Sequence, residues 1–70
     1  MRSLKRIFNK IGMENPFWSD YTCFAEAIHG KGFSRKTIIR NFNSLVDKED
    51  YARSEKKEII GHLVGLSKYG

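Results

Sequence analysis

The feature that most constrains the fold is a helical spacing of apolar residues, which recurs in four separate segments of the chain. The first segment has apolar residues at positions i, i+3, i+4 and i+7, namely Leu4, Ile7, Phe8 and Ile11. This spacing places side chains on one side of an α-helix. No segment alternates between apolar and polar residues for long enough to predict a β-strand. We therefore expect an all-α fold, a small bundle of about four short helices.

The helix boundaries are predicted from residues that cap helices. Ser3, Ser19, Ser34 and Ser54 each precede one of the four segments. A serine in this position accepts a hydrogen bond from a backbone N–H of the first helical turn. Gly12 and Gly30 are the expected stops of the first two helices. The four helices are then expected at about residues 4–11, 20–29, 35–46 and 55–66, within a single domain that spans residues 1–70.

A core is expected because 40% of the 70 residues are hydrophobic and 13% are aromatic, which excludes disorder throughout the chain. The residues expected to face inward from the last three helices are Tyr21, Phe24, Ala25, Ile28, Ile38, Ile39, Phe42, Leu45, Val46, Ile59, Ile60, Leu63 and Leu66. Phe17, Trp18 and Tyr21 could form a platform that stacks nucleic-acid bases. We expect these rings to fill core volume instead, with Trp18 as the one exception because it borders a turn.

Several classes of protein are excluded by composition. The single cysteine, Cys23, cannot form an internal disulfide, which points to a reducing compartment. No apolar run exceeds three residues, so no transmembrane helix, secretory signal or membrane association is expected, and we expect a cytoplasmic location. The soft metal ligands are limited to Cys23, His29 and His62, without the paired cysteines of a zinc site. We expect no metal, no cofactor and no enzymatic activity.

Positive charge is concentrated in the first two thirds of the chain. The formal net charge is +5, and residues 1–46 account for it, because residues 47–70 carry five charges of each sign. No acidic residue occurs between Glu26 and Asp47. The outer side of the third helix is expected to present Lys36, Thr37, Arg40, Asn43 and Ser44. A concentrated positive charge of this kind predicts a polyanionic partner.

Residues 34–43, with the sequence Ser-Arg-Lys-Thr-Ile-Ile-Arg-Asn-Phe-Asn, resemble the recognition helices of helix-turn-helix DNA-binding domains. Lactose-repressor-type and resolvase-type domains carry a similar Ser-x-x-Thr-(Ile/Val)-x-Arg pattern. The resemblance implies that residues 24–46 form a helix-turn-helix unit whose second helix lies in the major groove of DNA. The turn between Gly30 and Ser34 is longer by a residue or more than in those families.

The expected site residues divide into two groups by their chemistry. Arginine and asparagine form paired hydrogen bonds with guanine and adenine edges respectively, and the expected base contacts are Lys36, Thr37, Arg40 and Asn43. Phosphates are held by helix N-termini and by basic side chains, and the expected phosphate contacts are Lys31, Ser34, Arg35, Lys5 and Arg6.

Two functions follow from these patterns. The first is that of a small basic protein that binds nucleic acid, most simply duplex DNA, in a regulatory, plasmid or phage, or recombination accessory role. The alternative is a protein-interaction module whose charged face binds an acidic partner protein. The window without acidic residues favours the first, because nucleic acid requires such a surface and a protein partner does not. The sequence leaves open the choice between DNA and RNA, and between a monomer and a weak homodimer.

Overall fold

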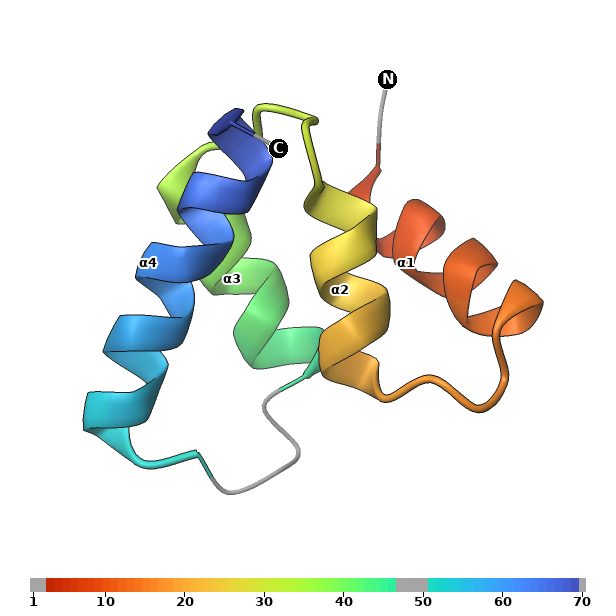
Figure 1. Cartoon of the computed structure of the whole chain (residues 1–70), viewed down its shortest axis with the longest axis horizontal. Helices are drawn as coiled ribbons and strands as arrows, with labels where there is room; N and C mark the ends of the chain where they lie inside the picture. The colour runs from red at the N-terminus through yellow and green to blue at the C-terminus, as the bar shows by residue number, and fades with distance from the viewer. Residues whose placement is uncertain (1–2, 47–50, 70) are drawn as a thin grey trace.

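The chain folds into four α-helices, as a computed structural model that describes residues 3–46 and 51–69 shows (Figure 1). The helices are α1 (Leu4–Glu14), α2 (Asp20–Ile28), α3 (Arg35–Leu45) and α4 (Arg53–Tyr69). The described residues form no β-strand. They also contain no helix long and apolar enough to cross a membrane. The expectation of a small all-α bundle is confirmed.

Three of the four predicted serine caps are confirmed. Ser3, Ser19 and Ser34 precede α1, α2 and α3, and each side-chain oxygen accepts a hydrogen bond from the backbone N–H three residues later. The prediction for Ser54 is wrong, because α4 already begins at Arg53. The backbone N–H of Lys56 donates to the carbonyl oxygen of Ala52 at 2.9 Å, so the first turn of α4 starts before Ser54.

The predicted ends of the first and last helices are also corrected. Helix α1 passes through Gly12 and ends at Glu14, where the backbone N–H and the Nδ2 group of Asn15 both donate to the carbonyl oxygen of Ile11. Asn15 therefore supplies the stop that the sequence assigned to Gly12. Helix α4 continues to Tyr69, three residues beyond the predicted end. Its last turns are held by contacts with the α2–α3 connection, described below.

Helices α2 and α3 each contact all three of the other helices, and Figure 1 shows α2 between α1 and α4. The ring of Phe24 on α2 meets the ring of Phe42 on α3 edge to face, with centroids 5.8 Å apart. On the other side it meets Phe8 of α1 at 6.4 Å. The buried apolar residues come from all four helices and the end of α3: Leu4, Cys23, Phe24, Ala27, Ile28, Ile38, Phe42, Val46, Ile60 and Leu63.

Phe17 and Ile39, both expected in the core, lie on the surface instead, and Trp18 is exposed as the expected exception. Phe17 is 98% exposed, because it lies in the turn between Asn15 and Trp18 that connects α1 to α2. Trp18 is 45% exposed and Tyr21 is half-buried. Ile39 is 36% exposed, because it is turned by about 100° from Ile38, which faces the core directly.

The connection between α2 and α3 is docked against the end of α4. Gly30 and Gly32 adopt positive φ angles of 67° and 69°, which glycine reaches without strain. The N–H of Gly30 donates to the carbonyl of Leu66 at 3.0 Å, and the N–H of Gly32 donates to the carbonyl of Ser67 at 2.8 Å. The N–H of Phe33 donates to the Oγ of buried Ser67 at 2.8 Å. The bonds from Gly30 and Gly32 satisfy carbonyl groups that the end of α4 leaves unpaired.

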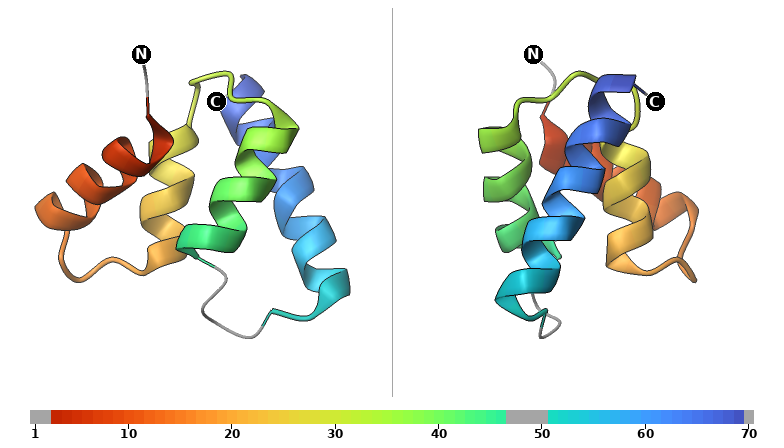
Figure 2. Two further views of the ribbon diagram at one scale, coloured as in Figure 1. Left: turned by 180° about the vertical axis from the view of Figure 1, so that it is seen from behind. Right: turned by 60° about the vertical axis from the view of Figure 1, so that its left-hand side comes forward.

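Helices α2 and α3 run in opposite directions, as the views of Figures 1 and 2 agree. Two antiparallel helices joined by a short connection form an αα-hairpin, whereas the two helices of a helix-turn-helix cross at roughly 90–120°. The helix-turn-helix unit expected for residues 24–46 is therefore not confirmed and stays a prediction. In the rear view of Figure 2, α3 lies between α2 and α4. The exposed residues Lys36, Arg40 and Asn43 mark the open side of α3.

Candidate nucleic-acid interface

The open side of α3 carries most of the predicted base-contact residues. Lys36, Arg40 and Asn43 are all exposed. Thr37 is half-buried, and its hydroxyl accepts a hydrogen bond from the Oγ of Ser34 at 2.9 Å. That bond belongs to the cap at the start of α3 and leaves the hydroxyl proton of Thr37 available to donate. The structure thus brings three of the four residues to one exposed side and places Thr37 at its border.

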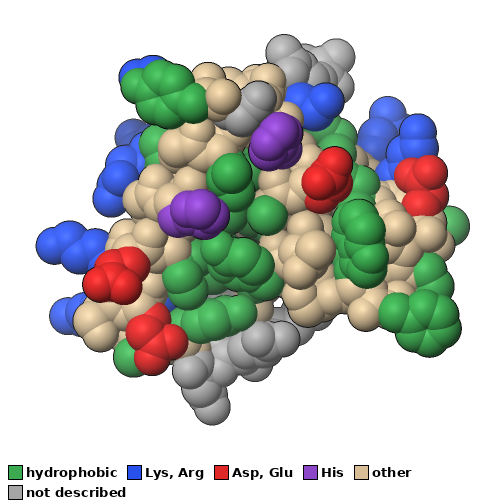
Figure 3. All heavy atoms as spheres, in the orientation of Figure 1, with side chains coloured by type: hydrophobic (Ala, Val, Ile, Leu, Met, Phe, Trp, Pro, Cys, Tyr) green, Lys and Arg blue, Asp and Glu red, His purple; other side chains and the backbone are tan. Residues whose placement is uncertain are grey.

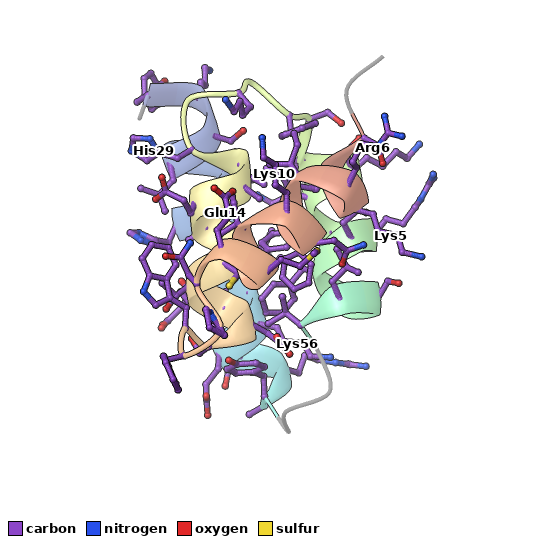
Figure 4. The ribbon with its side chains drawn as sticks, turned by 90° about the vertical axis from the view of Figure 1, so that its right-hand side faces the viewer. Lys5, Arg6, Lys10, Glu14, His29 and Lys56 are labelled. Carbon is purple, nitrogen blue, oxygen red and sulfur yellow. The ribbon has the colours of Figure 1, made fainter. Side chains whose placement is uncertain are left out.

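The predicted phosphate-contact residues lie at two places around α3. Lys31, Ser34 and Arg35 are exposed at the start of the helix and in the connection before it. Lys5 and Arg6 are exposed on α1. Figure 4 shows these two side chains on the side of α1 where α3 lies, while His29 lies on the opposite side of the molecule. The basic side of α1 therefore extends the exposed surface of α3.

A groove between α3 and α4 adds cations that the sequence analysis did not assign. The α3–α4 groove has a volume of about 330 Å³. It is lined by Arg35, Ile39 and Asn43 of α3, and by Arg53, Lys56, Lys57 and Ile60 of α4. None of these residues is acidic. Cations of α4 thus face the same surface as those of α3.

The acidic residues of α4 lie away from this groove. At about 100° per residue, Glu55 and Glu58 are turned roughly 120–180° from the direction shared by Arg53 and Lys57. Both glutamates are exposed. The sequence analysis missed the α4 cations because it summed the charge of residues 47–70, which is zero. The i, i+3, i+4, i+7 spacing of Arg53, Lys56, Lys57 and Ile60 is the signal that could have found them.

These positions define one surface, which we name the cationic face. It consists of Lys5 and Arg6 of α1, Arg35, Lys36 and Arg40 of α3, and Arg53, Lys56 and Lys57 of α4. Figure 3 shows the opposite side of the molecule, where acidic side chains, the histidines and apolar side chains gather and Lys and Arg occupy the margins. Within residues 3–46 and 51–69, acidic side chains therefore gather on the side opposite the cationic face.

Other chemistry-bearing side chains do not assemble into a site within the described residues. No group of three or more His, Cys, Asp or Glu side chains lies close enough there to hold a metal ion. Burial raises the pKa of the Cys23 thiol, and the negative charge of Asp20 raises this pKa further. A thiol with a raised pKa stays protonated at neutral pH and is a poor nucleophile. The cationic face remains the surface with the most distinctive chemistry.

Comparisons with protein-family models, with curated proteins and with solved structures found no match to this chain.

Proposed function

We propose that this protein binds nucleic acid, specifically duplex DNA, as a small basic protein with a regulatory, plasmid or phage, or recombination accessory role. The observation that carries the proposal is the cationic face, to which three helices contribute basic residues from separate parts of the sequence. Clustered Lys and Arg on one side of a basic domain are the electrostatic footprint of nucleic-acid binding. The calculated isoelectric point of about 9.6 agrees with this chemistry.

In this proposal α3 lies in the major groove, which is about 12 Å wide and admits an α-helix. Arg40 donates to a guanine edge and Asn43 pairs with an adenine edge, since these are the bases whose edges match their hydrogen-bonding groups. Lys36 and Thr37 contact bases nearer the start of the helix. The exposure of Lys36, Arg40 and Asn43 supports this arrangement.

The phosphates flanking that groove are held in the proposal by Lys5 and Arg6 from α1 and by Lys31, Ser34 and Arg35 around the start of α3. Phosphate contacts fix the position of a protein on DNA, whereas base contacts carry the sequence information. Two kinds of variant should therefore differ in their effects on binding.

A protein partner is the second candidate, and a specific observation favours it. Met13 is 83% exposed and lies close in sequence to the exposed Phe17 and Trp18. Methionine and aromatic residues are enriched in protein–protein interfaces. An acidic partner protein would use the same cations as DNA, so the experiment must separate the two ligands.

The test begins with selection of bound sequences from random duplexes, followed by measurement of affinity for the selected and for unrelated duplexes. Arg40→Ala and Asn43→Ala should each reduce the discrimination between the two by about 1–3 kcal/mol. Lys31→Ala should weaken binding to both duplexes alike. His62→Glu, which changes an exposed residue of the opposite side, is the control for a general change in charge. Dissociation constants that stay in the millimolar range at low salt would overturn the proposal and favour the acidic protein.

A further inference from the structure

The α3–α4 groove combines two features that a solvated row of cations does not need. Its walls carry Arg35, Arg53 and Lys57, with Ile39 among them and the buried Ile60 at its base. Ile39 is 36% exposed and adds an accessible apolar side chain to the row of cations. The groove therefore offers both positive charge and apolar contact to one ligand.

A nucleic-acid strand has the matching chemistry, because anionic phosphates alternate along it with the apolar faces of sugars and bases. Arg53 and Lys57 are four residues apart on α4, which separates their positions by about 6 Å along the helix axis. Two cations in such a row can contact phosphates of the same strand. An isolated anion would need neither the length of the row nor the isoleucines.

We infer that the α3–α4 groove holds the backbone of one DNA strand, with Arg53 and Lys57 at its phosphates and Ile39 against its sugars. This inference rests on the proposed function and extends it to α4. The groove borders the open side of α3, and Asn43 belongs to both. The strand held in the α3–α4 groove then borders the major groove of the DNA that α3 enters. Helix α4 therefore fixes how α3 is positioned along the DNA.

The charge arrangement of α4 supports a polyanion in the groove. Glu55 and Glu58 lie on the other side of the helix, so they do not repel a phosphate near Arg53 and Lys57. The described residues that line the groove include no acid. An acidic peptide would be attracted by the same cations, and it is therefore the competing ligand in the test.

The experiment compares the variant Arg53→Gln/Lys57→Gln with a control of equal formal charge loss, His29→Glu/His62→Glu, both measured at pH 8. The two control residues are exposed, and Figure 4 shows His29 on the side away from α3. Thermal melts of both variants show that they are folded. Anisotropy of a labelled duplex is then measured across a range of salt concentrations.

Each lost phosphate contact lowers the slope of log affinity against log salt by about 0.9. The Arg53→Gln/Lys57→Gln variant should therefore lose about 1.8 from that slope, equally for selected and unrelated duplexes, while the control keeps the slope of the unmodified protein. Ile39→Ala should lower affinity without changing the slope, because it removes apolar contact and no charge.

The outcomes separate the inference from the proposed function. If the unmodified protein binds duplex DNA and the slope falls for Lys5→Gln/Arg6→Gln but not for Arg53→Gln/Lys57→Gln, the strand does not lie in the groove and only the inference fails. If the protein binds no duplex but binds polyglutamate through Arg53 and Lys57, both fail and the groove is a site for acidic chains.

Discussion

Helices α3 and α4 line the same groove, but their sequences distribute charge in different ways. Helix α3 has no acidic residue between Arg35 and Leu45, so the sum of the formal charges along its sequence is positive. Helix α4 intersperses Glu55 and Glu58 with its cations, and the net charge of residues 47–70 is zero. In the structure both helices present cations to the α3–α4 groove.

The difference teaches that the charge of a segment and the charge of its exposed side are separate quantities. A helix turns about 100° per residue, so neighbours in sequence face different directions. The glutamates of α4 are neighbours of Lys56 and Lys57 in sequence, yet they lie on another side of the helix. A count that follows the helical period rather than the chain predicts the charge of an exposed helix side better.

The largest expected effect is on the free energy of unfolding, and it distinguishes the buried side of α3 from its exposed side. Phe42 is fully buried against Phe24, so Phe42→Ala should lower the free energy of unfolding by about 3–5 kcal/mol. Arg40 lies about 200° away and is exposed, so Arg40→Ala should change it by less than about 0.5 kcal/mol. Thermal and denaturant melts measure both, and equal losses would contradict the orientation of α3.

A smaller effect on the free energy of unfolding is expected where α4 forms a hydrogen bond to the connection before α3. Ser67 is 1% exposed and its Oγ accepts the hydrogen bond from the N–H of Phe33. Ser67→Ala leaves that N–H without its partner and should cost about 1–3 kcal/mol of the free energy of unfolding. Ser44→Ala, at an exposed position of α3, is the control and should cost less than about 0.5 kcal/mol. A neutral Ser67→Ala would mean that the α2–α3 connection does not depend on α4.

The smallest effect is a gain in stability from within α4. Gly61 is exposed, and a Cβ added there would meet no atom within 4 Å. Since glycine costs a helix interior about 0.8–1.0 kcal/mol relative to alanine, Gly61→Ala should raise the free energy of unfolding by up to about 1 kcal/mol. The shift of the urea midpoint measures this gain. A loss of stability would contradict the open surroundings of Gly61 in α4.

Much of the fold could be predicted from the sequence because its signals are local. The serine caps before α1, α2 and α3 and the apolar spacing of all four helices depend on residues within one or two turns of each other. The position of Phe42 in the core and the exposure of Lys36 and Arg40 follow from the same spacing.

The remaining features depend on contacts between distant residues. Phe17 is exposed because of how the α1–α2 connection turns, and no apolar spacing describes that turn. The extra length of the Gly30–Ser34 turn is explained by its hydrogen bonds to Leu66 and Ser67, more than 30 residues away. The contribution of α4 to the cationic face required knowing which side of α4 meets α3.

The central claim is that the cationic face binds the phosphates of duplex DNA. The most direct test is to titrate the unmodified protein with duplex DNA at several salt concentrations. Six cations are assigned to phosphates: Lys5, Arg6, Arg35, Arg53 and Lys57 of the cationic face, and Lys31 in the connection before α3. At about 0.9 for each contact, log affinity should fall linearly with log salt with a slope of about −5. A slope near zero, or no binding to duplex even at low salt, would contradict the account.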